Sequence, residues 1–215
     1  MSRPPITLVC FAVKEEARSF RNTLSDAHPQ SQILITGMGR QNTEKCFLAA
    51  LAERRPELVL TCGFAGGLKP ELETGTVLFE ADEATGLRSP LAKAGALPGR
   101  FHCANRIATT AAEKSALRKE TGADAVEMES GFIRSICEQQ QIPAATVRVI
   151  LDTANEDLPL DFNKLMTEDL RLDGRKLALT LAKSPGKIGS LLRMQKQTTN
   201  AAKRLGEVLT RVLDQ

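Results

Sequence analysis

The chain has 215 residues, 42% apolar and 26% charged, which are ordinary proportions for one globular domain with a sizeable core. A net charge of +3 and only 4% aromatic residues argue against a surface that binds nucleic acid. Five scattered cysteines without a C-x-x-C pair predict reduced thiols, and the start of the chain predicts neither a signal peptide nor a membrane span. We therefore expect a single cytoplasmic domain over residues 1–215.

Short β-branched or apolar runs recur along the chain, and each predicts a buried strand. They cover residues 6–13, 32–35, 57–62, 76–79 and 144–150. Helical patterns separate them, such as residues 42–55, where Asn42 is a candidate N-cap. This alternation predicts an α/β fold, with a central mixed, largely parallel twisted sheet flanked by helices. Ligand sites in such sheets form at the carboxyl ends of the strands.

The remaining segments have a weaker or a purely helical pattern. Residues 81–99 are rich in Gly, Ala and Pro and predict a loop or a short irregular excursion. From Asp161 the pattern is helical, with breaks at 173–174 and 184–186. Residues 183–211 carry seven Lys and Arg against the single acid Glu207. This charge pattern favours a solvated helix face over contact with an anionic membrane surface, which basic amphipathic helices also make.

The segment TCGFAGGL, residues 61–68, follows a predicted strand and contains three glycines. Glycine allows close approach of the backbone to a ligand, and a tight turn into the next element is the alternative interpretation. The pair Gly37 and Gly39 lacks the third glycine of a dinucleotide fingerprint. Motifs for phosphate loops, zinc proteases and serine hydrolases are also missing, so we expect no cofactor and no metal.

Several charged residues follow or interrupt the apolar runs. Glu16 follows the first predicted strand, and the stretch VEME at 126–129 places Glu127 and Glu129 in an apolar context. Arg148 lies in the last predicted strand, and Asp152 lies at its end. Charges in such places are usually paired or functional. The structural alternatives are a helix-dipole role for Glu16 and an ion pair of Arg148 with Asp152 or Glu129.

Five motifs occur in the order FAVKEEA, ITGMGRQN, TCGFAGGLKPELETGTV, AVEMES and VRVILDTANED. In this order they resemble the signatures of the purine nucleoside phosphorylases and methylthioadenosine/adenosylhomocysteine nucleosidases, over about residues 6–157. The shortened middle and the tail from DLPLDF are most similar to the branch called hopanoid-associated phosphorylases. The resemblance implies a small-molecule nucleoside as ligand, and a homodimer or trimer, because relatives complete their pockets with a neighbouring chain.

The resemblance also implies the catalytic residues. Glu16 matches the carboxylate that activates water in the nucleosidases, and Arg148 with Thr36 matches the pair that positions this water. Asp152 matches the acid that donates a proton toward N7 of the leaving purine. These residue types suit the reaction, because cleavage of an N-glycosidic bond builds positive charge on the ribose and negative charge on the base.

Five further positions are implied to bind the substrate. Met128 and Glu129 match the ribose-binding pair, and Ile107 lies where family members hold the base edge through backbone groups. Arg106 occupies a position often held by a Phe that stacks on the purine, and Gly66 belongs to the glycine segment.

Departures from the family pattern leave three functions open. Thr61 and Phe64 stand where phosphorolytic relatives hold phosphate with an arginine and a serine, so we expect hydrolysis of a purine nucleoside, with an apolar 5′ substituent as one form of it. Phosphorolysis with inorganic phosphate is the alternative. A catalytically silent nucleoside-binding protein is the third, suggested by Leu151, Phe64 and Arg106 in place of the usual residues.

Overall fold

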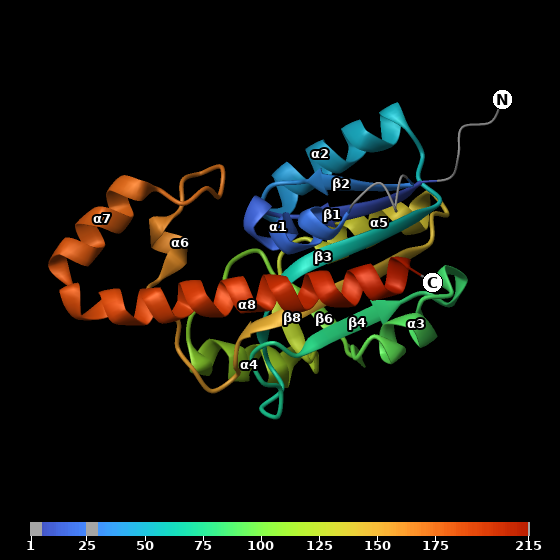
Figure 1. The fold of residues 1–215 in the computed structure, drawn as a ribbon. Helices are drawn as coiled ribbons and strands as arrows, with labels where there is room; N and C mark the ends of the chain where they lie inside the picture. Colours follow the sequence, from blue (N-terminus) through green and yellow to red (C-terminus); the bar gives the residue numbers. More distant parts are fainter. Residues whose placement is uncertain (1–5, 25–29, 215) are drawn as a thin grey trace.

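The computed structural model describes residues 6–24 and 30–214. They form one eight-stranded sheet with helices packed against it (Figure 1). The strands pair in the order β2-β1-β3-β8-β4-β5, and β7 pairs with the end of β3 and with β6. Their bounds are β1 (Thr7–Phe11), β2 (Ser31–Ile35), β3 (Leu58–Gly67), β4 (Val77–Ala81), β5 (Leu97–Pro98), β6 (Phe101–Cys103), β7 (Ala125–Glu127) and β8 (Ala144–Asp152).

The sheet is mixed and largely parallel, as the sequence predicts. Strands β2, β1, β3 and β8 run parallel to one another, whereas β4 is antiparallel to β8 and β7 is antiparallel to the end of β3. The carboxyl ends of β1, β3 and β8 therefore meet at one edge of the sheet, where ligand sites form in this class of fold.

Eight α-helices and two short 3₁₀ segments are present in the described part of the chain. They are α1 (Lys14–Thr23), α2 (Gly39–Glu53), η1 (Glu83–Thr85), α3 (Arg88–Lys93), α4 (Ala111–Thr121), α5 (Ser130–Gln139), α6 (Phe162–Leu165), α7 (Gly174–Lys183), η2 (Pro185–Lys187) and α8 (Ile188–Leu213).

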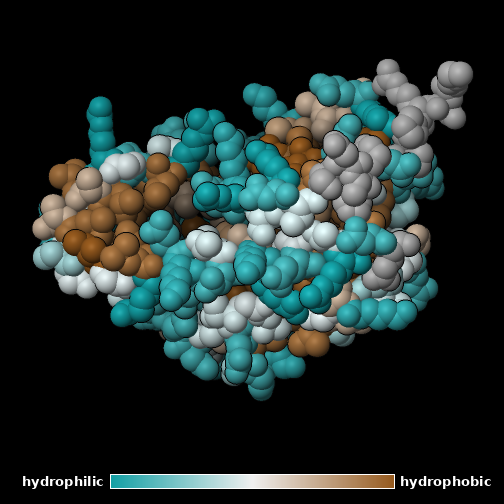
Figure 2. Space-filling view, in the orientation of Figure 1, coloured by the Kyte–Doolittle hydropathy of each residue, from teal (hydrophilic) through white to brown (hydrophobic). Residues whose placement is uncertain are grey.

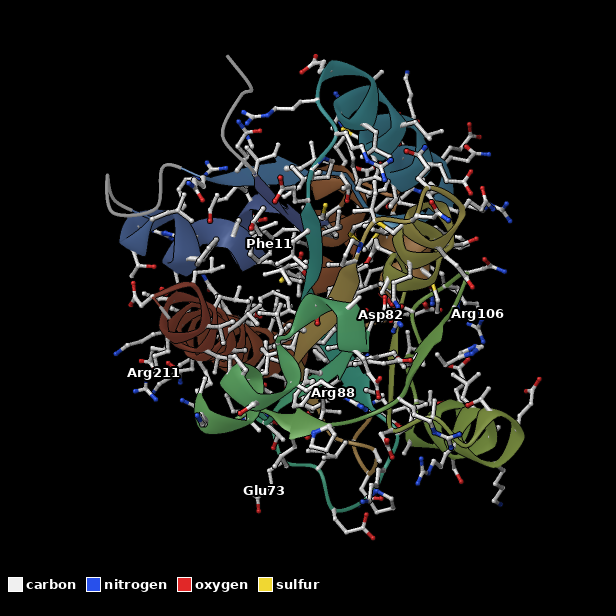
Figure 3. All side chains as sticks on the ribbon, turned by 90° about the vertical axis from the view of Figure 1, so that its right-hand side faces the viewer. Phe11, Glu73, Asp82, Arg88, Arg106 and Arg211 are labelled. Atoms are coloured by element: carbon white, nitrogen blue, oxygen red, sulfur yellow. The ribbon has the colours of Figure 1, made fainter. Side chains whose placement is uncertain are left out.

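Helices cover both faces of the sheet. Alternate residues of β1 belong to two cores: Phe11 packs with residues of α1, α3 and α8, whereas Cys10 packs with residues of α2 and α5. In Figure 3, Phe11 lies in the interior and Arg211 of α8 points outward. Because both faces are buried, the central strands are continuous apolar runs rather than alternating ones.

Some local predictions are wrong. Helix α2 begins at Gly39, and Asn42 lies inside it, where its side chain donates hydrogen bonds to the carbonyls of Met38 at 3.0 Å and Asp169 at 2.9 Å. Residues 81–99 are not a loop, because they contain η1, α3 and β5, with Leu91 fully buried. The glycine segment is no turn either, since β3 continues through Gly67.

The C-terminal part follows its predicted breaks. Asp173 caps α7 by accepting hydrogen bonds from the N–H groups of Arg175 at 2.9 Å and Lys176 at 3.2 Å, and residues 184–187 turn the chain into α8. Figure 1 shows α8, the long red helix, along one face of the sheet, and α7 beyond the end of the sheet. No helix in residues 6–24 and 30–214 is long and apolar enough to cross a membrane. All five cysteines are free thiols.

Candidate active site

A cavity of about 230 Å³ opens at the carboxyl ends of β1, β3 and β8. Its volume suits a small organic molecule rather than a single ion, because one water takes about 30 Å³ of liquid volume. Seven of the nine residues predicted for the site line this cavity: Glu16, Gly66, Arg106, Ile107, Met128, Glu129 and Asp152. The other two, Thr36 and Arg148, lie outside the lining.

Glu16, in the first turn of α1, is buried with its carboxylate against the sheet. Its Oε2 accepts hydrogen bonds from the N–H groups of Ala12 at 2.9 Å and Val13 at 3.1 Å, and its Oε1 accepts one from Phe64 at 2.8 Å. Burial raises the pKa of Glu16, while Arg148 and the three N–H donors oppose this shift. The carboxylate is thus fixed in one orientation and made more basic, as a general base requires.

Gly63 of β3 allows two charged side chains to meet over the strand. A Cβ at this position would lie 2.5 Å from Glu16 Oε1 and 2.6 Å from Arg148 Nη1, distances that real Cβ atoms do not show. Its φ of +149° also favours glycine. The glycine at position 63, which lies within β3, therefore makes room for the side chains of Glu16 and Arg148 to pack closely at the site.

Arg148, in the middle of β8, is almost completely buried. Its Nη2 donates to Glu127 Oε2 at 2.7 Å, and its Nη1 donates to Glu129 Oε2 at 3.4 Å. Glu127 is held further by the N–H groups of Glu129 and Ser130, at 2.9 and 2.7 Å, and by the Ser130 hydroxyl at 2.7 Å. Arg148 therefore pairs mainly with Glu127, whereas Asp152, one of the two partners considered above, pairs elsewhere.

Glu129 lies at the start of α5 and reaches the first turn of α2. Its Oε1 accepts a hydrogen bond from the N–H of Gly39 at 3.1 Å. Burial raises the pKa of Glu129 to about 7, with Arg148 opposing the shift and Glu127 adding to it. Near neutral pH the Glu129 side chain therefore changes between the carboxylate, which only accepts hydrogen bonds, and the neutral carboxylic acid.

Asp152, the last residue of β8, forms an ion pair with Lys114 of α4. The distance from Lys114 Nζ to Asp152 Oδ2 is 2.5 Å, and Nζ also donates to the carbonyls of Thr153 at 2.7 Å and Glu156 at 2.8 Å. The fully buried ammonium group of Lys114 is thus held by one carboxylate charge and two carbonyl acceptors. Burial raises the pKa of Asp152, and Lys114 opposes this shift.

Lys114 is the principal site residue that the sequence does not reveal. Between Glu113 and Ser115 it has the setting of a surface lysine, and α4 has no strong apolar stripe. Only the packing of α4 against the loop after β8 buries it. Its neighbour Glu113 does carry a recognisable signal, because Thr110 and Glu113 form a capping box at the start of α4.

The backbone N–H and carbonyl groups of Ile107 are both hydrogen-bonded to the side chain of Asn163. Its N–H donates to Asn163 Oδ1 at 3.0 Å, and its carbonyl accepts from Asn163 Nδ2 at 2.9 Å. An amide side chain thus makes the pair of hydrogen bonds, one accepted and one donated, that the edge of a base would make with the same backbone. Asn163 belongs to the short helix α6, whose first residue, Phe162, lines the cavity.

Arg106 lies on the loop before α4, at the outer side of the molecule in Figure 3. Its Nη2 is 2.5 Å from Glu113 Oε1, in an ion pair with the arginine side chain 63% exposed. The Glu113 carboxylate also accepts from the N–H of Thr109 at 2.7 Å, and these contacts lower its pKa to about 2. Arg106 is thus held at the cavity rim.

Two other predicted residues differ in their relation to the cavity. Gly66 lies beside Asp152, since a Cβ on Gly66 would meet Asp152 Oδ2 at 3.3 Å. The Thr36 hydroxyl donates to the carbonyls of Phe11 at 3.3 Å and Gly37 at 3.0 Å. The water-positioning role of Thr36 and Arg148 stays a prediction.

The rest of the cavity is mostly apolar. Large side chains from several elements contribute, namely Met38, Phe64, Met128, Leu151, Leu158, Phe162 and Met194. Its ionisable residues are four acids, Glu16, Glu127, Glu129 and Asp152, and one base, Arg106. Within the described ranges, no cluster of three or more His, Cys, Asp or Glu could hold a metal ion.

Known proteins resemble this chain in sequence and in fold. The sequence model of the phosphorylase superfamily matches residues 83–183. The 5′-methylthioadenosine/S-adenosylhomocysteine nucleosidase of Marinomonas sp. (strain MWYL1) is 23% identical over 170 residues, covering 62% of this chain and 73% of the relative.

Solved structures extend the similarity over nearly the whole chain. The 5′-methylthioadenosine/S-adenosylhomocysteine nucleosidase of Neisseria meningitidis, in complex with methylthio-immucillin-A, has a TM-score of 0.71 at 17% identity, covering 98% of this chain and 99% of that one. Futalosine hydrolase of Helicobacter pylori has a TM-score of 0.65 at 15% identity, covering 95% and 97%. The chain is thus similar to the phosphorylase superfamily in sequence over residues 83–183, and it has the fold of these nucleosidases over nearly its whole length.

Proposed function

We propose that this protein hydrolyses the N-glycosidic bond of a purine nucleoside, preferably one with an apolar 5′ substituent. The observation that carries the proposal is that Glu16 of α1 and Asp152 of β8 both lie beside the same strand, β3, at two different points of its length. Glu16 lies against Gly63 of β3 and Asp152 lies beside Gly66. Three residues of a strand span roughly 10 Å, which leaves room for a ribose and its base between the two carboxyl groups.

Glu16 is the general base in this proposal. It takes a proton from water while the water oxygen forms a bond to C1′ and the bond from C1′ to the purine nitrogen breaks. Burial raises the pKa of Glu16, which makes the carboxylate a better proton acceptor. Glu129 accepts hydrogen bonds from the ribose hydroxyls, and these contacts strengthen as positive charge develops on the sugar.

Asp152 donates a proton to N7 of the leaving base. Lys114 influences this step because it holds Asp152 in place and lowers its pKa. The ammonium group fixes one carboxyl oxygen of Asp152 at 2.5 Å. Burial favours the protonated carboxylic acid and Lys114 favours the carboxylate, so the pair balances two opposed effects on one group. We assign Lys114 as a positioning residue, because it acts on the base only through Asp152.

The base edge takes the place of Asn163 on the backbone of Ile107. Two hydrogen bonds to Ile107 N–H and carbonyl are exchanged for two of the same kind, so the exchange costs little. Release of Asn163 frees α6, and with it Phe162 at the cavity. In Asn163→Ala, base binding no longer competes with the side chain, so we expect KM to fall severalfold with kcat unchanged.

The charges of the cavity favour water over phosphate as the nucleophile. The carboxylates of Glu16 and Glu127 repel a phosphate dianion, and the guanidinium of Arg148 is already bonded to Glu127, Glu129 and Thr61. Arg106 is paired with Glu113 at the rim. The apolar side chains around Met194 and Phe162 offer no ion pair and suit an apolar 5′ group.

A panel of purine nucleosides, including 5′-methylthioadenosine and adenosine, tests the proposal in buffers with and without phosphate. We expect free base and the free sugar, which is ribose or its 5-methylthio derivative, at a rate that phosphate does not change. The corresponding sugar 1-phosphate formed only with phosphate would establish phosphorolysis instead, and tight binding without base release would establish a silent binding protein.

A matched pair of variants tests the general base. Glu16→Gln should lower turnover by a factor on the order of 10² or more. Glu15→Gln, which changes an exposed carboxylate one residue earlier, should have no effect. Equal rates of both variants would contradict the role of Glu16. A cytoplasmic location and a homo-oligomer stay predictions of the sequence.

A further inference from the structure

The segment from Leu172 to Lys196, here the C-terminal hairpin, projects from the body of the protein. It contains α7, η2 and the first turns of α8. Among the described elements, α7 packs mainly against its neighbours α6 and η2 rather than against the sheet. Figure 1 shows it at the left end of the molecule, beyond the ends of the strands. One side of α7 therefore faces solvent.

Large apolar side chains concentrate on this hairpin. Four of the six exposed large apolar residues of the described chain belong to it: Leu172 at 50%, Leu179 at 64%, Ile188 at 46% and Leu192 at 60%. Figure 2 shows the resulting hydrophobic area at the left of the molecule, over α7 and the start of α8. Contiguous apolar surface of this kind marks an interaction site.

The active site does not account for the leucines. Met194 of α8 lines the cavity, whereas Leu192 is roughly 200° from it around the helix, at 100° per residue. The outward face of α8 is therefore distinct from the inward face that builds the cavity. Leu192 is 60% exposed and Leu179 is 64% exposed, so neither is needed for the core.

Basic residues surround these leucines. Within residues 172–196 there are six Lys and Arg and one acid, Asp173, which caps α7: Arg175, Lys176, Lys183, Lys187, Arg193 and Lys196. On α7, Lys176 and Lys183 are three and four residues from Leu179, and on α8 Lys196 is four residues from Leu192. Residues at these spacings share a helix face, so the apolar and basic side chains are presented together.

We propose that the C-terminal hairpin docks on an anionic phospholipid surface. The leucines enter the headgroup region, and the lysines extend their charged ends to the lipid phosphates. Charge complementarity selects this partner over a second copy, because two hairpins of this kind would bring their positive charges together. No helix in the described ranges could cross the bilayer, so the contact is peripheral.

Vesicle flotation of the full chain tests the proposal. We expect the protein to float with vesicles of phosphatidylcholine and phosphatidylglycerol and to remain free with phosphatidylcholine alone. Added salt should weaken the binding, because it screens the lysines. Absence of binding to the anionic vesicles at low salt would overturn the proposal.

Two sets of hairpin variants, each with a matched control, locate the contact. Leu179→Ser with Leu192→Ser is compared with Leu48→Ser and Leu97→Ser, which are exposed to 47% and 52% elsewhere. Lys183→Glu, Lys187→Glu and Lys196→Glu are compared with Lys45→Glu, Lys93→Glu and Lys119→Glu, which change the net charge equally at exposed positions. Each hairpin set should weaken binding by roughly tenfold or more, and each control set by much less.

Equal loss in the control sets would show attraction by net charge alone and would overturn the docking site. Light scattering of the same samples without vesicles tests whether a second copy of this chain occupies the surface instead of a membrane. A dimer that Leu179→Ser with Leu192→Ser converts to monomer would assign the surface to a second copy and overturn the proposal. If the serine variant fails to fold, the lysine set, whose exposed side chains carry no core packing, decides the question.

Discussion

The two buried cations in the part of the chain that the structure describes, Arg148 and Lys114, hold carboxyl groups in different ways. Arg148 divides its donors between Glu127 and Glu129, and Glu127 is saturated by three further donors. Lys114 has one carboxylate partner, Asp152, and fills its other two donor positions with carbonyl groups. The first arrangement fixes Glu127 with four hydrogen-bond donors, whereas the second leaves at Asp152 a single carboxyl whose proton can be exchanged.

The largest expected effect follows from loss of that exchangeable proton. Asp152→Asn keeps the volume but cannot deliver a proton, so turnover of ordinary purine nucleosides should fall by roughly 10² to 10⁴. The loss should be smaller for a p-nitrophenyl riboside, whose leaving group departs without protonation. Equal losses on both substrates, together with a lower melting temperature, would reduce Asp152 to a structural partner of Lys114.

Loss of the other cation should act mainly on stability. Arg148→Met leaves Glu127, Glu129 and Glu16 buried without a cation, and the free energy of unfolding should fall by about 3–5 kcal/mol. Arg40→Met, which breaks an exposed pair with Glu44, should cost less than about 1 kcal/mol. Urea unfolding monitored by circular dichroism measures both, and equal values would contradict the structural role assigned to Arg148.

Glu129 should make substrate binding depend on pH near neutrality. Its pKa is raised to about 7, and only the carboxylate accepts two hydrogen bonds from ribose. KM should therefore rise by about tenfold from pH 8 to pH 6, as the carboxyl is protonated, and Glu129→Gln should remove this dependence. Glu138→Gln, at an exposed position of the same helix, serves as the control and should keep it.

The smallest effect is a shift of the pH profile in Lys114→Met. Lys114 lowers the pKa of Asp152, so without the ammonium group the buried carboxyl stays protonated to higher pH. The decline of kcat on the alkaline side should then move upward by about one pH unit, which is about 1.4 kcal/mol. Lys119→Met on the same helix should leave the profile in place. A uniform loss at every pH would indicate that Lys114 only supports the fold.

Sequence alone determined the type of fold of this protein and seven of the residues that line its cavity. Continuous apolar runs mark the central strands because both faces of the sheet are buried. The order of the motifs predicted that Glu16, Glu129 and Asp152 belong to one site, and all three line the same cavity. Strands β6 and β7 escaped prediction because three residues are too few for a periodic pattern.

The tertiary structure decided the partners and the exposure. Glu127 and Glu129 are both carboxylates near Arg148, and only the packing of β7 against β3 beside β8 makes Glu127 its principal partner. Lys114 has the local sequence of a surface residue until α4 packs against the loop after β8. The same holds in reverse for Leu179, whose helical pattern is that of a core residue, while its helix lies beyond the sheet. Such contacts join segments distant in sequence, and their geometry depends on how whole elements pack.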